Sequence, residues 1–269
     1  MKQGLISSVL ALVEAAGQAT LAYWQADVAV QTKADESPVT AADLAAHQIL
    51  AQGLAELDSR IPVLSEEDCE IALSERAQWT RWWLVDPLDG TKEFIHGSAE
   101  YTVNVALIEQ GRVIFGVVGV PVTGQLYYGG LDLGAYCRDA DGSVRRLQMR
   151  STPVDELVVV ASKRHSSPEQ EALLQDLSQA FTGLHLLNVG SSLKFCQLAE
   201  GSADLYPRFA PTSQWDTAAA QGVLEGAGGT VINMQGEPLS YAAGADYLNP
   251  YFLAFAQDSN WQQWFMARL

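Results

Sequence analysis

The sequence predicts a mixed α+β protein, and three patterns along its 269 residues lead to this class. Apolar residues first recur at helical spacing, then alternate as in β-strands from residue 101, and then switch between the two patterns beyond residue 150. Two helices followed by a β-meander are typical of α+β folds, whereas strands that alternate with helices are typical of α/β folds. The change of pattern suggests two domains, residues 1–150 and 151–269, with a boundary between 140 and 155.

The first half is expected to begin with two helices. Leu5, Val9, Leu12 and neighbouring apolar residues have the spacing of an amphipathic helix over 4–26. Thr40 and Asp43 match a capping box at the start of a second helix over 41–57, after a polar loop. Short apolar segments then predict strands over 62–64, 82–85, 101–108, 113–120, 125–128 and 134–137.

The second half alternates between the two element types. Strands are expected over 157–161, 185–189, 203–206 and 229–232, and helices over 168–180, 193–200 and 216–227. Between the halves, Arg145, Arg146 and Arg150 form a basic patch, which we interpret as a solvated turn without a functional role.

Charge and cysteine content exclude several classes of function. The formal net charge of −16 argues against binding of nucleic-acid polymers and against adhesion to anionic lipid by charge alone. Cys69, Cys137 and Cys196 lack metal-ligand spacing and are expected to be reduced thiols of a cytoplasmic protein. Glu14 interrupts the apolar N-terminal residues, so we expect neither a signal peptide nor a transmembrane segment.

The segment Asp86-Pro87-Leu88-Asp89-Gly90-Thr91 follows a buried strand and is the most informative part of the chain. Pro87 fixes its own φ and Gly90 permits a positive φ, so a tight turn here can direct Asp86, Asp89 and the Leu88 carbonyl to one point. Three hard oxygens at one point suit Mg²⁺. Pro-x-Asp-Gly is also an ordinary turn signal, so this motif alone leaves a purely structural interpretation open.

Other acidic residues stand where strands end or helices begin, namely Asp43, Glu66, Glu67 and Asp216. Asp43 and Asp216 have the alternative role of helix caps, and Glu66-Glu67-Asp68 has that of a solvated loop. If these carboxylates converge, cations must hold them together, because their mutual repulsion and desolvation are unfavourable. Bound cations would also let an acidic protein bind an anionic substrate.

Basic and hydroxyl residues form a second set of candidates. Gly190-Ser191-Ser192-Leu193-Lys194 joins a strand to a helix, a common arrangement at phosphate sites, although such turns often contain Gly and Ser without a ligand. Arg208 ends another strand and can bind a phosphate in a bidentate way, or face solvent. His165 lies in Ser162–His165, just beyond a strand, and no second His has ligand spacing.

Together these segments resemble the inositol monophosphatase-like family of Mg²⁺-dependent, lithium-inhibited phosphatases. The family pattern is an acidic pair after a strand, then Asp-Pro-[Ile/Leu]-Asp-Gly-[Thr/Ser], then Trp-Asp; the matching residues are Glu66-Glu67, Asp86 to Thr91 and Trp215-Asp216. The resemblance covers essentially the whole chain. One branch of this family consists of the CysQ-type bacterial 3′(2′),5′-bisphosphate nucleotidases. The chain resembles this branch in the segments Ser37–Asp43, Leu64–Asp68, Asp86–Phe94, Gly190–Cys196 and Leu205–Phe209. Inositol monophosphatases usually read Gly-Thr-Thr-Asn-Phe at the position where this chain reads Gly90-Thr91-Lys92-Glu93-Phe94.

The resemblance implies a layered αβαβα sandwich and a role for each matching residue. Two or three Mg²⁺ ions would be bound by Glu66, Asp86, the Leu88 carbonyl, Asp89 and Asp216. Asp43, Thr91 and Glu66 would orient and deprotonate the attacking water. The substrate would contact Lys33, Glu66, Asp89, Gly90, Thr91, His165, Ser191, Ser192, Lys194, Arg208 and Asp216.

The implied reaction is hydrolysis of 3′-phosphoadenosine 5′-phosphate (PAP) to AMP and phosphate, with the sulfated analogue PAPS as a second substrate. The alternatives are a phosphatase for inositol or sugar phosphates, and a non-catalytic nucleotide or phosphate sensor that kept the fold. The expected partner is the small nucleotide bisphosphate, for a monomer or homodimer. The expected location is the cytoplasm, with peripheral placement at the inner membrane left open.

Overall fold

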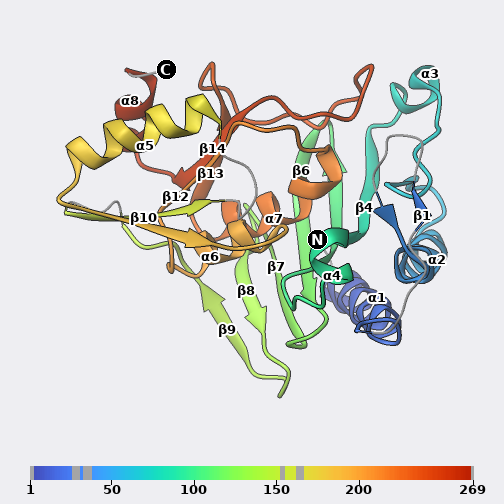
Figure 1. Cartoon of the computed structure of the whole chain (residues 1–269). Coiled ribbons are helices and arrows are strands. Elements are labelled where there is room, and N and C mark those ends of the chain that lie inside the picture. The colour runs from blue at the N-terminus through green and yellow to red at the C-terminus, as the bar shows by residue number, and fades with distance from the viewer. Residues whose placement is uncertain (1–2, 26–30, 33–37, 152–154, 162–166, 268–269) are drawn as a thin grey trace.

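Two large β-sheets alternate with three layers of helices in the computed structural model of the protein (Figure 1). The structure describes residues 3–25, 31–32, 38–151, 155–161 and 167–267. Helices α1 (Gln3–Leu21) and α2 (Ala41–Leu57) form one outer layer at the lower right of Figure 1. Helices α5 (Pro168–Ala180) and α8 (Ser259–Met266) form the opposite outer layer at the upper left. Helices α6 (Leu193–Ala199) and α7 (Gln214–Gly226) lie between the sheets.

The first sheet has seven strands in chain order, with β3 parallel to β4 and every later pair antiparallel. Its strands are β3 (Val63–Ser65), β4 (Arg81–Asp89), β5 (Thr102–Glu109), β6 (Arg112–Val120), β7 (Gln125–Gly130), β8 (Gly134–Arg138) and β9 (Val144–Leu147). The short helices α3 (Leu73–Arg76) and α4 (Thr91–Ile95) flank β4 in the chain. A two-stranded sheet pairs β1 (Gln31–Thr32) with β2 (Pro38–Val39).

The second sheet has five strands in the order β11-β10-β12-β14-β13. Its strands are β10 (Glu156–Ala161), β11 (Gly183–Asn188), β12 (Leu205–Arg208), β13 (Gly229–Asn233) and β14 (Phe252–Ala256). β10 is parallel to β11 and β12, while β14 is antiparallel to β12 and β13. The second half is therefore a mixed sheet, and its antiparallel part departs from simple strand–helix alternation.

Apolar burial explains why the layers stack in this order. The face of the seven-stranded sheet that carries Trp83, Val105 and Phe115 packs on α1 and α2. Its opposite face packs on α6 and α7, and the same cluster continues into the five-stranded sheet through Tyr206 and Phe252. One hydrophobic core therefore joins both halves of the chain, so residues that approach each other between the sheets are held by extensive packing.

The predicted class and the layered αβαβα sandwich are confirmed, and most elements lie within a few residues of their expected bounds. The second helix spans Ala41–Leu57, with the capping box of Thr40 and Asp43 formed. Seven elements had no predicted counterpart, namely β1, β2, α3, α4, β9, β14 and α8. The division at residue 150 stays a prediction.

The arginines of the basic patch are exposed, as predicted, but the first two lie in a strand and not in a turn. Residues Val144–Leu147 form β9, and Arg145 pairs with Glu200 at 2.7 Å. Arg150 makes a bidentate ion pair with the buried Asp204. Arg145 and Arg150 thus have carboxylate partners, which accounts for a basic residue at these two positions of an acidic chain.

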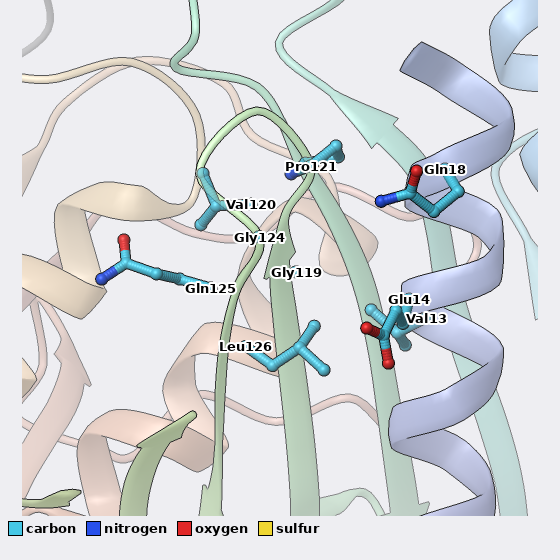
Figure 2. A pocket seen from close by; sticks show the side chains of 10 residues that line it. Val13, Glu14, Gln18, Gly119, Val120, Pro121, Gly124, Gln125 and Leu126 are labelled. Atoms are coloured by element: carbon cyan, nitrogen blue, oxygen red, sulfur yellow. The ribbon is translucent and has the colours of Figure 1, made fainter. Parts of the chain in front are cut away.

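Helix α1 is the one helix of the described ranges that is long and apolar enough to cross a membrane by length and composition. Its buried residues Ile6, Val9 and Val13 pack on the seven-stranded sheet, so its apolar character also suits a core helix. A hollow between α1 and the β6–β7 turn is lined by Val13, Gln18 and Gln125 among others (Figure 2). Its volume is about 30 Å³, and none of the candidate site residues lines it.

Candidate active site

Asp86 and Asp89 are brought together by an irregularity in β4. The predicted turn is part of the strand, which continues to Asp89, and the register shifts between Asp86 and Asp89. Asp86 pairs with Asn104 and Asp89 pairs with Thr102, so β4 has one residue more than β5 between the two pairs. Residues three apart in a regular strand face opposite sides, and one extra residue corrects this. The bulge therefore directs both carboxylates to the same site.

Asp216 reaches the same point from the second half of the chain. It occupies the N3 position of α7, and its Oδ2 accepts a hydrogen bond from the Ser213 N–H at 2.9 Å, completing a capping box. One carboxylate oxygen each of Asp86, Asp89 and Asp216 lies within 4.8 Å of the others. The cap and the ligand cluster, which the sequence offered as alternatives for Asp216, are thus both present in the structure.

Burial and mutual repulsion disfavour the charged forms of these carboxylates. Desolvation raises the pKa of Asp86 and of Asp216 well above the ordinary value, and the charge of Glu66 adds to both effects. Burial raises the pKa of Asp89 to about 6, although Lys194 and the Ser192 N–H act in the opposite direction. Among the described residues, the ion pairs within 4.0 Å involve none of these three carboxylates. The cluster therefore has a strong electrostatic demand for a cation.

Asp43 and Thr91 form a second group beside the cluster. Asp43 is buried, and its Oδ2 accepts hydrogen bonds from the N–H and the hydroxyl of Thr40 at 2.8 and 2.6 Å. The Thr91 hydroxyl is 3.4 Å from both Asp43 Oδ1 and the Leu88 carbonyl oxygen. Burial raises the pKa of Asp43, with a further contribution from Glu67. A hydroxyl between two acceptors is well placed to orient a water molecule and to pass on its proton.

Two backbone turns meet at the edge of the cluster. Gly90 has a φ of 90° and a Cβ there would lie 3.3 Å from the Cβ of Ser191, which itself has a φ of 47°. A Cβ at Gly190 would lie 2.9 Å from the Glu100 carbonyl oxygen. The Gly190 N–H donates to Glu100 Oε2 at 2.9 Å. The glycines thus permit the close approach of the two halves of the chain.

The predicted cations lie beside Asp89. Lys194 is buried, its Nζ donates to the Ser191 carbonyl at 2.9 Å, and burial lowers its pKa to about 8. The guanidinium of Arg208 donates to the carbonyl oxygens of Ala210 and Pro211. Both charges lower the pKa of Asp89, which shows that they act on the same region. The structure thus provides a cationic side next to the carboxylates.

Two of the predicted residues, Lys33 and His165, lie outside the described residues. Ser192 lies at the site, but its hydroxyl is buried and bonded to Thr102 and Asn104. Sequence reasoning missed Thr102, Asn104 and Glu100. The signal for the first two was the pair of polar residues at alternate positions in an otherwise apolar strand.

The donor set fits a hard divalent cation. Carboxylate oxygens dominate the cluster, and among the described residues neither histidine nor cysteine contributes to it. Oxygen-only ligand sets favour Mg²⁺, Ca²⁺ or Mn²⁺ over softer metals. The residues present are therefore those expected to hold such an ion.

Five alternating layers and a carboxylate cluster suited to a hard divalent cation agree with the class of metal-dependent phosphatases. The inositol monophosphatase family model matches residues 2–267, and the chain belongs to this family. The CysQ 3′(2′),5′-bisphosphate nucleotidase of Salmonella typhimurium is 44% identical over 250 residues, which cover 92% of this chain and 98% of that protein. The CysQ nucleotidase of Haemophilus influenzae is 33% identical over 266 residues, covering 98% of each chain.

Solved structures agree with this assignment. CysQ from Bacteroides thetaiotaomicron, a bacterial member of the inositol monophosphatase family, has a TM-score of 0.84 at 35% identity and covers 96% of this chain and 98% of its own. An IMPase from Thermotoga maritima has a TM-score of 0.78 at 19% identity, covering 99% of this chain and 98% of its own, and supports the fold alone.

Proposed function

We propose that this protein is a Mg²⁺-dependent 3′(2′),5′-bisphosphate nucleotidase that hydrolyses PAP to AMP and phosphate, and PAPS to its desphospho product APS. The observation that carries the proposal is the carboxylate cluster of Asp86, Asp89 and Asp216 with Lys194 and Arg208 beside it. A substrate with two phosphates suits this arrangement, because one phosphate can be hydrolysed at the metal site while the cations hold the other. The CysQ relatives at 33–44% identity support the same substrate class.

The metal ligands in this proposal are Glu66, Asp86, the Leu88 carbonyl, Asp89 and Asp216, for two or three Mg²⁺ ions. When bound, Mg²⁺ would lower the pKa of the attacking water and neutralise charge on the phosphate. The chain's own contribution is geometric. The Thr91 hydroxyl donates its proton to Asp43 Oδ1 and can accept a hydrogen bond from the attacking water, which orients that water. Thr40 fixes Asp43 through two hydrogen bonds, so the acceptor oxygen stays directed at Thr91.

The nucleotide would be held mainly by residues of the second half of the chain. Arg208 and Lys194 would bind the phosphate that is not hydrolysed, together with Ser191 and Gly90 at the junction of the two turns. His165 and Lys33 keep the substrate-binding roles predicted from the resemblance, whereas the Ser192 hydroxyl is already bonded to Thr102 and Asn104. In this division, residues 1–150 carry most metal ligands, while residues 151–269 carry the nucleotide contacts and Asp216.

The test is phosphate release from PAP with and without Mg²⁺, measured beside inositol 1-phosphate and repeated with millimolar Li⁺. We expect Mg²⁺-dependent release, strong preference for PAP, and inhibition by Li⁺. Preference for inositol 1-phosphate would keep the metal site and overturn the roles of Lys194 and Arg208. Absence of release from either compound, with PAP still bound, would favour a nucleotide sensor over an enzyme.

We also propose that the protein acts in the cytoplasm, as a monomer or homodimer. Cys137 and Cys196 are buried thiols outside any disulfide, as expected of a protein in a reducing compartment. Light scattering after size-exclusion chromatography measures the oligomeric state. Cell fractionation that recovers the protein with the inner membrane would replace the cytoplasmic assignment by a peripheral one.

A further inference from the structure

A closed ring of hydrogen bonds joins the two halves of the chain directly behind Asp89. The Ser192 hydroxyl donates to Asn104 Oδ1 at 2.8 Å, and the Asn104 amide donates to Thr102 Oγ1 at 3.1 Å. Thr102 Oγ1 and Ser192 Oγ are 2.8 Å apart. Because Ser192 has already given its proton to Asn104, the Thr102 hydroxyl donates to Ser192, and every bond runs in the same direction around the ring.

The ring is well suited to fix its three side chains in one position. Thr102, Asn104 and Ser192 are 0%, 1% and 2% exposed, so water cannot replace a lost partner. Each hydroxyl donates once and accepts once, and hydrogen bonds that follow one another in one direction strengthen each other in a medium of low dielectric constant. Removal of one member takes the bond partner from one buried donor and one buried acceptor of the other two.

The ring is linked to the metal ligands on both sides. Thr102 is the cross-strand partner of Asp89 and Asn104 is that of Asp86, on either side of the β4 bulge. The backbone N–H of Ser192 donates to Asp89 Oδ2 at 2.5 Å. The same serine therefore holds the second half of the chain through its hydroxyl and a ligand carboxylate through its N–H.

We propose that Thr102, Asn104 and the Ser192 hydroxyl position Asp89 for cation binding, and that Ser192 acts as a positioning residue instead of contacting the nucleotide through its side chain. The inference rests on the proposed function for the identity of the metal. It differs from the role that the family resemblance implies for Ser192. It also assigns a role to two strand residues for which sequence reasoning had none.

The experiment is Mg²⁺ binding by calorimetry to the metal-free protein, without substrate, in Thr102→Val, Ser192→Ala and the double variant. Each single change is expected to lower the Mg²⁺ affinity about tenfold. This is the smaller of the effects usually seen when a residue that orients a metal ligand is lost. The double variant should bind no more weakly than the singles, because either change already breaks the ring. Thr102→Ser keeps the hydroxyl and should restore binding.

Thr20→Val is the matched control. Thr20 is as buried as Thr102, and its hydroxyl lies 2.9 Å from the Tyr101 hydroxyl, so the same substitution breaks a buried hydroxyl pair outside the ring. Urea unfolding shows whether each variant is folded, and Ser192→Ala, the smallest change, remains informative if Thr102→Val is not. Equal Mg²⁺ affinity in Thr102→Val and Thr20→Val would overturn the proposal, as would additive losses in the double variant. A rise in KM for PAP in Ser192→Ala alone, with unchanged Mg²⁺ affinity, would restore the substrate contact.

Since calorimetry needs no turnover, this result is separate from that of the proposed function. A wild-type protein that binds Mg²⁺ but leaves PAP intact refutes the nucleotidase, and the ring is still tested by the variants.

Discussion

Replacement of Asp89 by Asn should stabilise the metal-free protein at neutral pH. Burial raises the pKa of Asp89 to about 6, against 3.8 for an ordinary Asp. Since the folded-state pKa is the higher one, the unfolded state ionises first, and stability falls as pH rises from about 4 to 6. The difference of about two pH units, at about 1.4 kcal/mol each, gives about 3 kcal/mol of destabilisation at pH 7.

Asparagine removes this contribution without changing the shape of the side chain. Its amide oxygen still accepts the Ser192 N–H, and the loss of one charge also lowers the pKa values of Asp86 and Asp216, both of which the charge of Asp89 raises. Stability of Asp89→Asn should therefore depend less on pH above 4 than that of wild type.

The assay is urea unfolding in EDTA at pH 4, 5, 6 and 7.5, with Asp58→Asn as control. The pKa of Asp58 is lowered to about 2 by hydrogen bonds from Arg60, so this carboxylate titrates below the pH range used. Mg²⁺ should then stabilise wild type at pH 7.5 by binding to the folded state, and leave Asp89→Asn unchanged and without Mg²⁺-dependent turnover. Parallel pH profiles for wild type and Asp89→Asn in EDTA would refute the reasoning, and turnover near wild type in the variant would refute the metal assignment.

Three further predictions concern other parts of the molecule. Arg208→Ala should raise KM for PAP about tenfold, the effect of one lost charged hydrogen bond. Its effect on hydrolysis of a simple phosphate ester should be smaller. Equal losses on both substrates in steady-state kinetics would exclude a role of Arg208 in binding the second phosphate. Arg150→Ala should lower the free energy of unfolding in urea by about 1–3 kcal/mol, because Asp204, whose side chain is 2% exposed, loses its charged partner; an unchanged midpoint would contradict this. Tyr247→Phe should cost about 1 kcal/mol in the same assay, since its hydroxyl donates to the Cys69 carbonyl at 2.5 Å; a stabilised variant would contradict it.

Local signals explain what could be predicted from the sequence. The capping box of Thr40 and Asp43 depends on residues three apart, and the helix that it begins was placed at its observed bounds. Asp86 and Asp89 stood out because a proline and a glycine accompany two carboxylates within a short segment. These features need no knowledge of the tertiary fold.

Non-local pairing explains what could not be predicted. The strand β14, Phe252–Ala256, lies between β12 and β13 in the sheet, an order that no periodicity expresses. The extra residue between Asp86 and Asp89 becomes a bulge only through the register with β5, so the segment was interpreted as a turn. Thr102 and Asn104 gain their role only when Ser192, from the other half of the chain, is packed against them. The layer order itself came from the family resemblance.

A common feature of the metal ligands unites the site. In each of the three clustered carboxylates, one oxygen accepts a hydrogen bond from a backbone N–H: that of Leu88 for Asp86, Ser192 for Asp89 and Ser213 for Asp216. Such bonds favour the charged form, partly offset the cost of burial, and leave the second oxygen for a cation. Backbone donors persist through any substitution other than proline and are fixed by strand and helix geometry. The ligand cluster is thus preorganised by the elements that build the fold, which explains how residues from the two halves of the chain can converge before a metal ion binds.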